Sequence, residues 1–514
     1  MARRDRRGAR EIELKLTAPP GTTALLAEHP LLREPFAVAR RKRQSATYFD
    51  TPDLHLRVAG LALRIRRVAG EEGARQTLKS AGAAAGLFDR DEWESAVAGE
   101  APDLDMLAAT PAAFVLADPA ARAALAPVFT VDVTRAAAIV SGDDMAAEIV
   151  FDEGEIRAGA NVEIVGEIEL ELLRGKPRRL FRLARELMAA APLRPAVHSK
   201  SDRGYALLAG AVAPAERVAP VLAPGMSVGD AFQAIARACL RQFAVQETIL
   251  LQAPAPGAIH QMRVAIRRLR AAMSVFRKAT DCKARKGVND SLRRVARSLG
   301  EARELDVFIA GEIDPMRERH PEDADAARLA NHFARQRDAA YARVMEAIWS
   351  KQHRLAVFDA LAFVETGRWR RNAACAAPVT DFAARMLSRR ASGIRKRARA
   401  ISSLDVEQRH DLRIAVKKLR YAAEFFAPFF SEGAGAGKRA ARYGKTLAAL
   451  QDRLGELNDA ATAISITGRL DRNDAAQMRA ARIMDEDRVG RAAASLAAAR
   501  KAGAAFARAK PFWD

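Results

Sequence analysis

The sequence predicts an α+β protein with two unlike halves, an antiparallel β-rich first half and an all-helical second half. Its 514 residues exceed the usual size of one domain. Short runs of alternating polar and apolar residues, separated by turn-like segments, fill the first half and are typical of antiparallel strands. Beyond a stretch interrupted by prolines, the pattern becomes helical and rich in Ala, Arg and Leu. We therefore expect one domain over residues 9–210, a linker over 211–225 and a helical domain over 226–500.

The net charge of +21 is confined to the second half. Residues 1–214 contain 30 basic and 30 acidic side chains, so the whole excess lies in residues 215–514. A strongly basic domain attracts polyanions such as nucleic acid, anionic membrane or polyphosphate. The sequence has no nucleic-acid-binding signature, and no apolar stretch reaches the roughly 20 residues of a membrane span. We therefore expect an anionic partner, but neither specific nucleic-acid binding nor a membrane.

The three cysteines, Cys239, Cys282 and Cys375, are far apart and odd in number. They suit a reducing compartment and offer neither a disulfide framework nor a zinc site. The basic start, Met1 to Arg7, is not followed by an apolar core and is unlike a secretory signal. We expect a cytoplasmic protein, with association to polyphosphate granules as a further option. The oligomeric state is left open.

Charged residues alternate with apolar residues along several expected strands of the first half. Side chains two positions apart share one face of a strand, at about 7 Å. The rows formed in this way are Glu11, Glu13 and Lys15; Glu167, Glu169 and Glu171; Arg64 and Arg66; Lys79; and Glu92 and Glu94. A single row of this kind is as often an ordinary solvated face. Three neighbouring carboxylates repel one another unless a cation offsets the repulsion.

A closed sheet would turn these charged rows toward a common cavity. Carboxylates would then hold Mg²⁺ or Mn²⁺ through oxygen ligands, while Arg and Lys would hold phosphate oxygens. That combination suits metal-assisted transfer of a phosphoryl group to water.

Six short motifs occur in order along the first half. They are Glu11–Lys15, Tyr48–Pro52, Gly60–Arg66, Thr77–Lys79, Glu167–Glu171 and Lys200–Tyr205. The first motif is weak by itself, but the ordered set resembles the CYTH superfamily, the triphosphate tunnel metalloenzymes. The resemblance covers about residues 9–210. It implies an eight-stranded antiparallel β-barrel tunnel, metal dependence, and hydrolysis of triphosphate to pyrophosphate and phosphate.

The resemblance also implies roles for individual residues. Metal ligands would be Glu11, Glu13, Asp152, Glu167, Glu169 and Glu171. Phosphate would be bound by Lys15, Arg64, Arg66, Lys79, Arg135, Lys200 and Arg203. Glu92 and Glu94 would complete the acidic side of the tunnel, and the catalytic group would be Glu11, Glu13 and Lys15. Lys15 is a candidate base if nearby cations lower its pKa, whereas a metal-bound water needs no such base. The structural alternative is that interior carboxylates only pair with neighbouring arginines.

The second half repeats a segment at an offset of 150 residues. His260–Arg263 corresponds to His410–Arg413, and Arg267–Arg270 to Lys417–Arg420; Leu299–Glu301 corresponds to Leu454–Glu456 at an offset of 155. At about 100° per residue, each segment places a row of cations beside an apolar stripe. The rows are His260, Arg263, Arg267 and Arg270, and His410, Arg413, Lys417 and Arg420. Like charges four apart destabilise a helix unless an anion joins them, and a solvated face is the alternative.

These helices resemble the CHAD domain, the conserved-histidine α-helical domain, over about residues 226–500, with an internal repeat of about 230–310 and 380–470. The resemblance implies two four-helix bundles in tandem that bind inorganic polyphosphate in a basic channel. A CYTH–CHAD tandem implies an inorganic triphosphatase whose helical half binds polyphosphate. Two alternatives remain open. One is a nucleotide-using CYTH enzyme, either a class IV type adenylate cyclase or a thiamine triphosphatase; the other is a non-catalytic polyphosphate-binding scaffold.

Overall fold

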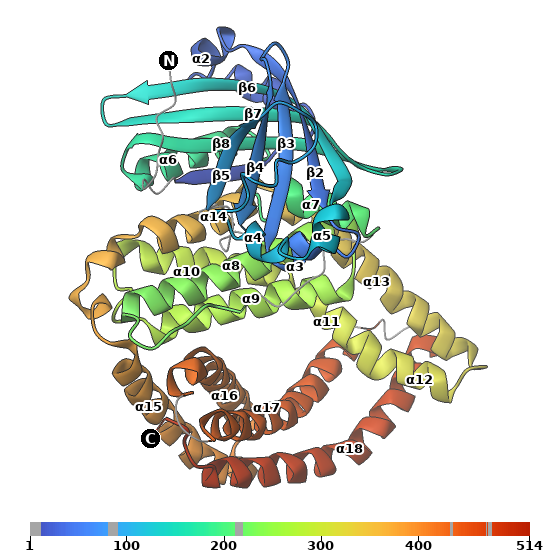
Figure 1. The fold of residues 1–514 in the computed structure, drawn as a ribbon. Helices are drawn as coiled ribbons and strands as arrows, with labels where there is room; N and C mark the ends of the chain where they lie inside the picture. The colour runs from blue at the N-terminus through green and yellow to red at the C-terminus, as the bar shows by residue number, and fades with distance from the viewer. Residues whose placement is uncertain are drawn as a thin grey trace. The chain divides into compact units, whose positions relative to one another are not determined.

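The computed structural model describes residues 12–80, 91–210, 219–431, 435–468, 470 and 475–513. The chain divides into two compact units (Figure 1). The first comprises Met1–Arg217, Ala244–Ala253 and Trp349–Ala362, and the second comprises Val218–Phe243, Pro254–Ile348 and Phe363–Asp514. The predicted β-rich first half and helical second half are both confirmed. Residues 211–218 of the expected linker lie outside the described residues.

An antiparallel sheet of nine strands forms the first unit, in the order β5-β4-β3-β2-β6-β7-β8-β1-β9. The strands are β1 (Glu13–Thr17), β2 (Arg41–Asp50), β3 (Leu61–Val68), β4 (Ala74–Ser80), β5 (Glu92–Val97), β6 (Ala126–Gly142), β7 (Met145–Ala158), β8 (Asn161–Gly175) and β9 (Arg194–Pro195). Within the described residues the edge strands β5 and β9 do not pair, so the predicted closed barrel is wrong. Closure needs a full strand at each edge, and β9 pairs with β1 only at Leu16 and Thr17.

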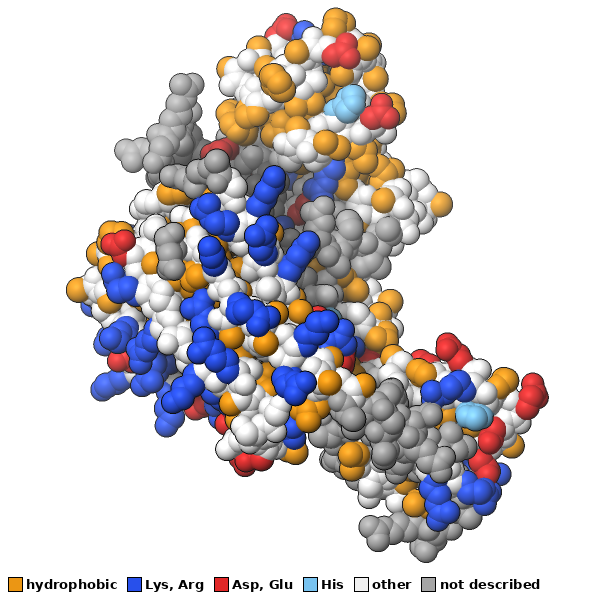
Figure 2. All heavy atoms as spheres, turned by 90° about the horizontal axis from the view of Figure 1, so that it is seen from below, with side chains coloured by type: hydrophobic (Ala, Val, Ile, Leu, Met, Phe, Trp, Pro, Cys, Tyr) orange, Lys and Arg blue, Asp and Glu red, His pale blue; other side chains and the backbone are white. Residues whose placement is uncertain are grey.

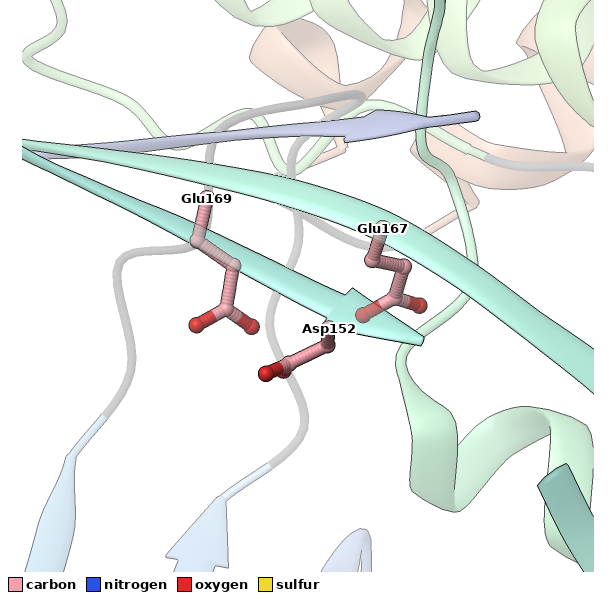
Figure 3. A group of neighbouring side chains, drawn as sticks. All are labelled: Asp152, Glu167 and Glu169. Atoms are coloured by element: carbon pink, nitrogen blue, oxygen red, sulfur yellow. The ribbon is translucent and has the colours of Figure 1, made fainter. Parts of the chain in front are cut away.

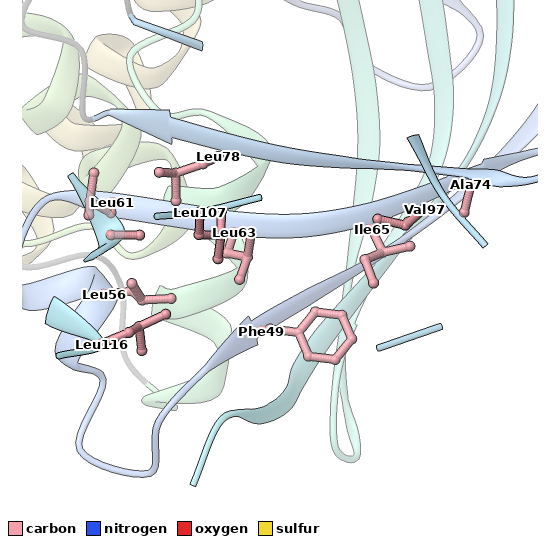
Figure 4. Packing of buried hydrophobic residues seen from close by; sticks show 11 residues of the cluster. Phe49, Leu56, Leu61, Leu63, Ile65, Ala74, Leu78, Val97, Leu107 and Leu116 are labelled. Atoms are coloured by element: carbon pink, nitrogen blue, oxygen red, sulfur yellow. The ribbon is translucent and has the colours of Figure 1, made fainter. Parts of the chain in front are cut away.

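The predicted alternation separates an apolar face of the sheet from a charged one. Strand β3 buries Leu61, Leu63 and Ile65 on one side and turns Arg64 and Arg66 to the other. The apolar side joins side chains of α3 (His55–Val58) and α4 (Ala112–Val115) in a buried cluster (Figure 4). Full burial of a Leu or Ile side chain stabilises a fold by about 1.5–3 kcal/mol. Because neighbouring residues of a strand point to opposite faces, burial of this cluster turns Arg64 and Arg66 to the charged face.

Helices cover both faces of the sheet. On β7 and β8, α6 (Pro177–Ala190) packs with a buried stripe that includes Leu180, Leu183 and Leu187. The charged face receives α7 (Lys200–Leu208), which packs on β6, β7 and β8. The remaining short helices of this unit are α1 (Thr22–Ala27), α2 (Arg33–Ala37) and α5 (Pro119–Ala123). Helix α7 thus lies at one end of the charged face, where the strands carry apolar residues such as Phe129 and Val131.

The described residues of the second unit form helices and their connections, without a β-strand, as predicted. Its helices include α9 (Pro256–Val275), α10 (Lys283–Ser298), α11 (Gly300–Phe308), α12 (Asp314–Arg319), α13 (Ala324–Trp349), α15 (Val379–Arg399), α16 (Val406–Phe426), α17 (Ala436–Thr467) and α18 (Ala475–Arg508). Helices α8 (Val228–Gln252) and α14 (Lys351–Thr366) are divided between the units. Helices α15 to α18 pack as four neighbours in a ring. The two repeated cationic segments lie on α9 and α16, which pack against each other.

Many Lys and Arg side chains lie on the face that Figure 2 shows. In the described part of the chain, none of the helices has both the length and the apolar character needed to cross a lipid bilayer.

Candidate metal and phosphate sites

Three carboxylates from β7 and β8 converge on the charged face (Figure 3). Asp152 lies on β7 opposite Glu167 of β8, and Glu169 follows two residues later. One oxygen from each lies within 4.8 Å of the other two, and the residues are 0%, 2% and 8% exposed. Buried carboxylates this close need a cation between them. Carboxylate oxygens are the ligands that Mg²⁺ and Mn²⁺ prefer, so the cluster fits a divalent metal.

Two cations of the chain itself neutralise this cluster. Lys200 Nζ contacts Glu167 Oε2 and lies 2.9 Å from Asp152 Oδ2 and 3.4 Å from Glu169 Oε1. From β6, Arg135 donates Nε to Asp152 Oδ1 at 2.7 Å and Nη2 to Glu169 Oε2 at 3.0 Å. Burial alone would raise the pKa of Asp152 and of Glu169, but the neighbouring cations lower both below their usual values. Both carboxylates are therefore ionised at neutral pH.

Strand β1 adds one carboxylate and one ammonium group. Lys15 Nζ donates to Glu169 Oε1 at 2.7 Å and lies 3.4 Å from Glu13 Oε1. Burial acts to lower the pKa of Lys15, but Glu169 and Glu13 outweigh it and raise the pKa. A base role for Lys15 would need a lowered pKa, so this arrangement does not favour it, and the role stays a prediction. Lys15 is a protonated hydrogen-bond donor in this arrangement.

Strands β3, β4 and β5 contribute a second group of charges. Lys79 Nζ donates to Glu92 Oε2 at 2.8 Å, and Arg66 Nη2 to Glu94 Oε1 at 3.3 Å. The Nε atoms of Arg64 and Arg66 are buried and have no hydrogen-bond partner among the described residues. Burial and the nearby Arg64 lower the pKa of Lys79 to about 8. A buried N–H without an acceptor is costly, so these guanidinium groups are suited to receive an anion.

The two charged groups belong to one site, because their charges act on each other. Lys79 on β4 interacts electrostatically with Glu13 on β1, and Arg135 on β6 with Arg64 on β3. Carboxylates that fit a metal and cations that fit phosphate therefore line the same face. In Figure 1, the strands β6 to β8 run across the direction of β2 to β5.

Helix α7 completes the site with Lys200 and Arg203. Arg203 donates Nη1 to Glu167 Oε1 at 3.2 Å and Nε to Glu163 Oε1 at 2.8 Å. Among the other predicted residues, Glu171 lies opposite Glu13 in the β1–β8 register, outside the three-carboxylate cluster. Glu11 lies outside the described residues. Sequence reasoning missed Glu163, which has the same strand parity as Glu167 and Glu169 but is separated from them by Val165.

The cationic rows of α9 and α16 face each other in the helical unit. The pKa of Lys417 is lowered to about 7 by burial and by the charges of Arg413 and Arg267. Because Arg267 belongs to α9 and Lys417 to α16, cations of the two helices are close enough to repel each other. The Nε atoms of Arg263, Arg267 and Arg413 are buried without a hydrogen-bond partner in the described part of the chain. Burial, with Arg303 and Arg267, lowers the pKa of His260 to about 4, so this histidine is neutral at pH 7.

The outer members of these rows have partners within the helical unit. Arg270 donates Nε to Asn289 Oδ1 at 3.2 Å, and Arg420 donates Nε to Glu424 Oε1 at 3.0 Å. His410 Nδ1 lies 2.7 Å from Asn458 Oδ1. The buried Nε atoms without a hydrogen-bond partner among the described residues therefore lie at the centre of the rows, and the binding roles of the outer residues stay predictions.

The repeated glycines have matching positions beside repeated arginines. A Cβ atom on Gly300 would lie 3.3 Å from Arg263 Nη1, and one on Gly455 would lie 3.9 Å from Arg413 Nε. In each repeat, a glycine thus lies beside the corresponding arginine, where any larger side chain would take up space. The two halves of the sequence repeat therefore pack around their arginines in the same way.

Comparison with known proteins agrees with this architecture. Residues 9–205 match the CYTH domain model, and residues 234–467 match the CHAD domain model. The chain therefore consists of a CYTH domain followed by a CHAD domain.

Individual relatives are more distant. An inorganic triphosphatase of Haemophilus influenzae is 29% identical over 201 residues, which cover 38% of this chain and 54% of that protein. The chain thus matches about half the length of this relative. The solved CHAD domain of Ricinus communis covers 57% of this chain and 97% of its own at 25% identity, with a TM-score of 0.49. A Hippeastrum adenylyl cyclase candidate with a dominant triphosphatase activity covers 39% and 96% at 20% identity, with a TM-score of 0.30.

Proposed function

We propose that the CYTH domain hydrolyses inorganic triphosphate to pyrophosphate and phosphate with Mg²⁺ or Mn²⁺. The observation that carries the proposal is a single charged face that holds Asp152, Glu167 and Glu169 and, on other strands, the buried Nε atoms of Arg64 and Arg66, which have no hydrogen-bond partner among the described residues. A chain of phosphates needs cationic donors along its length and a metal where charge develops. The name of the Haemophilus influenzae relative supports this choice of substrate.

The roles of the residues follow from their charges. Asp152, Glu167, Glu169 and Glu13 would hold the metal, which when bound supplies Lewis-acid polarisation and an activated water. Arg64 and Arg66 bind phosphate oxygens through N–H groups that have no acceptor among the described residues of the chain. Lys79, Lys15 and Lys200 add positive charge around the substrate, and Lys79 and Lys15 also stabilise the charge that spreads over the transferred phosphoryl group.

The direct test is phosphate release from triphosphate, pyrophosphate, ATP and thiamine triphosphate, with Mg²⁺ or Mn²⁺. We expect the highest kcat/KM with triphosphate. A higher value with ATP or thiamine triphosphate would favour the nucleotide-using alternative, and hydrolysis of none of the four would favour a scaffold. Glu169→Gln should lower kcat at least about 100-fold, because it removes one ligand charge. The matched control Glu155→Gln, on the same sheet but paired with Arg157, should leave kcat unchanged.

We further propose that the CHAD domain binds inorganic polyphosphate between α9 and α16. The specific support is the group of three buried Nε atoms on Arg263, Arg267 and Arg413 that lack an acceptor among the described residues, next to Lys417. Cations packed this closely repel one another, and a polyanion would offset the repulsion. Long polyphosphate presents such a row of charges.

Binding of long-chain polyphosphate to the full chain tests this second proposal. Affinity should fall steeply with added salt, as it does when several cations contact one polyanion. The double variant Arg267→Gln/Arg413→Gln should weaken binding at least about tenfold, whereas Arg343→Gln, which removes an exposed arginine paired with Glu301, should not. Equal weakening by the control, or tighter binding of DNA than of polyphosphate, would contradict the proposal.

A further inference from the structure

Helix α7 presents different residues to its two sides. Residues three apart on a helix share a side, and Lys200 and Arg203 both reach Glu167. Asp202 and Tyr205 are also three apart, and they contact Arg57 of α3 and the last residue of β2. The side that faces the candidate metal site and the side that is anchored are therefore distinct. The anchoring contacts are not part of the proposed substrate site.

Asp50, the last residue of β2, is the centre of the anchor. It is 0% exposed. Its Oδ1 accepts from the backbone N–H groups of Thr51 at 2.8 Å and Leu56 at 2.9 Å. Its Oδ2 accepts from Arg57 N at 2.9 Å and from the Tyr205 hydroxyl at 2.8 Å. One buried carboxylate thus joins the start of α3 to the middle of α7.

The loop that Asp50 organises is under backbone strain. Leu54 has a φ of 56°, in the left-handed region that non-glycine residues seldom adopt. Such a conformation persists only where the surroundings impose it. The hydrogen bonds from Leu56 and Arg57 to Asp50 hold the chain directly after this residue. Loss of the carboxylate would therefore release α3 as well as Tyr205.

A second link joins α3 to α7. Arg57 Nη1 donates to Asp202 Oδ1 at 2.6 Å, and its guanidinium group lies 5.1 Å from the centre of the Tyr205 ring. Asp202 also accepts from Ser199 N at 3.0 Å in the capping box that begins α7. The first turn of α7, which carries Lys200, is therefore fixed through Arg57.

The body of α7 lies close against the sheet. The Phe129 ring is stacked on Tyr48 and meets Tyr205 edge to face, with centroids 4.5 Å and 5.1 Å apart. At Gly204, a Cβ atom would lie only 2.2 Å from a ring carbon of Phe129. The helix therefore has little freedom to shift along the sheet while these contacts hold.

We propose that Asp50, Arg57 and Tyr205 are positioning residues, which set the affinity for triphosphate by holding Lys200 and Arg203 at the carboxylate cluster. The inference rests on the proposed triphosphatase activity. Among the described residues, no contact joins these three side chains to the carboxylate cluster, so each acts through α7. Lys200 and Arg203 bring charge to the substrate in the ground state and the transition state alike, so misplacement of α7 raises KM more than it lowers kcat.

The test compares Tyr205→Phe with Tyr341→Phe. Both changes remove only a hydroxyl that donates to a carboxylate; Tyr341 donates to Asp306 in the helical unit, at 3.1 Å and 3.2 Å from its two oxygens. Tyr205→Phe should raise KM for triphosphate about tenfold, the effect of losing one hydrogen bond to a charged group, with kcat within about threefold. Tyr341→Phe should leave both constants unchanged.

A double-mutant cycle separates positioning from general stability. In a Lys200→Ala/Arg203→Ala background, Tyr205→Phe should have no further effect on KM, because the residues that it positions are gone. Hydrogen exchange of the α7 amides, measured without substrate, should be faster in Tyr205→Phe than in the wild type. An additive effect on KM, unchanged exchange, or an equal rise of KM in Tyr341→Phe would overturn the inference.

The failure of the proposed activity is distinguishable from the failure of this inference. If the wild-type chain bound triphosphate without hydrolysing it, the proposed activity would be refuted. The same double-mutant cycle would then use the Kd of triphosphate, measured by calorimetry in the presence of EDTA, in place of KM. If it bound no triphosphate at all, both the proposed function and the inference would be overturned, whatever the exchange of α7.

Discussion

Lys200 Nζ lies 2.9 Å from Asp152 Oδ2 and also contacts Glu167 and Glu169, so an ammonium group stands among the three carboxylates that fit a metal. The lysine supplies the positive charge that a divalent cation would otherwise supply. The Lys200 ammonium group and a divalent metal ion would compete for the same carboxylates. Metal binding is therefore coupled to the position of Lys200, a side chain that we propose to bind phosphate.

Lys200→Met should raise the affinity for Mn²⁺ about tenfold or more, because a competing charge is removed from buried carboxylates. The same change should weaken triphosphate binding. The Kd of Mn²⁺ can be measured from the electron paramagnetic resonance signal of the free ion, without turnover. Lys42→Met is the matched control, since Lys42 lies on β2 and pairs with exposed Glu71. A lower Mn²⁺ affinity in Lys200→Met would refute the competition.

Triphosphate affinity should depend on pH through Lys79, whose pKa is lowered to about 8 by burial and Arg64. As pH rises through about 8, the free protein loses this positive charge, so KM should increase several-fold between about pH 7 and pH 9. The charged groups that act on Lys79 are Arg64, Glu92, Lys15 and Glu13. Lys79→Arg should remove the dependence of KM on pH between about pH 7 and pH 9. An unchanged dependence would show that another group causes it.

Gly204→Ala should destabilise the first unit, because the new Cβ would overlap the ring of Phe129. Overpacking of this kind costs about 1–3 kcal/mol, seen as a lower denaturant midpoint. Gly287→Ala provides the contrast, since Gly287 lies inside α10 and a Cβ there meets nothing within 4 Å. That variant should be more stable by about 0.5–1 kcal/mol. Equal midpoints for both variants would argue against the close packing of α7.

Polyphosphate binding should weaken as pH rises through about 7, where Lys417 loses its proton. The lowered pKa results from burial, Arg413 and Arg267, with Asp459 acting in the opposite direction. His260 is neutral across this range because its pKa is lowered to about 4. Titration of the 514-residue chain with polyphosphate between about pH 6 and pH 8 measures the effect. Lys417→Arg should remove it, and retention of the full pH dependence would contradict this role.

Local patterns in the sequence were enough to predict the two halves and most of the charged rows. Alternation on a strand is set by the backbone, so Arg64 and Arg66 had to share a face once β3 formed. Likewise, the spacing of His260, Arg263 and Arg267 places them on one side of α9. The concentration of positive charge in the second half is a property of composition alone.

Tertiary structure decided which of these rows meet and how their charges balance. Lys15 keeps its proton because Glu169, 154 residues away along the chain, lies 2.7 Å from its ammonium group. The hydrogen bond between Tyr205 and Asp50 also joins residues distant in sequence, 155 apart, and no local pattern predicts it. The openness of the sheet depends on the two-residue strand β9 at its edge. Side-chain direction is a local consequence of backbone geometry, whereas partners, burial and pKa depend on packing between segments that the linear sequence does not bring together.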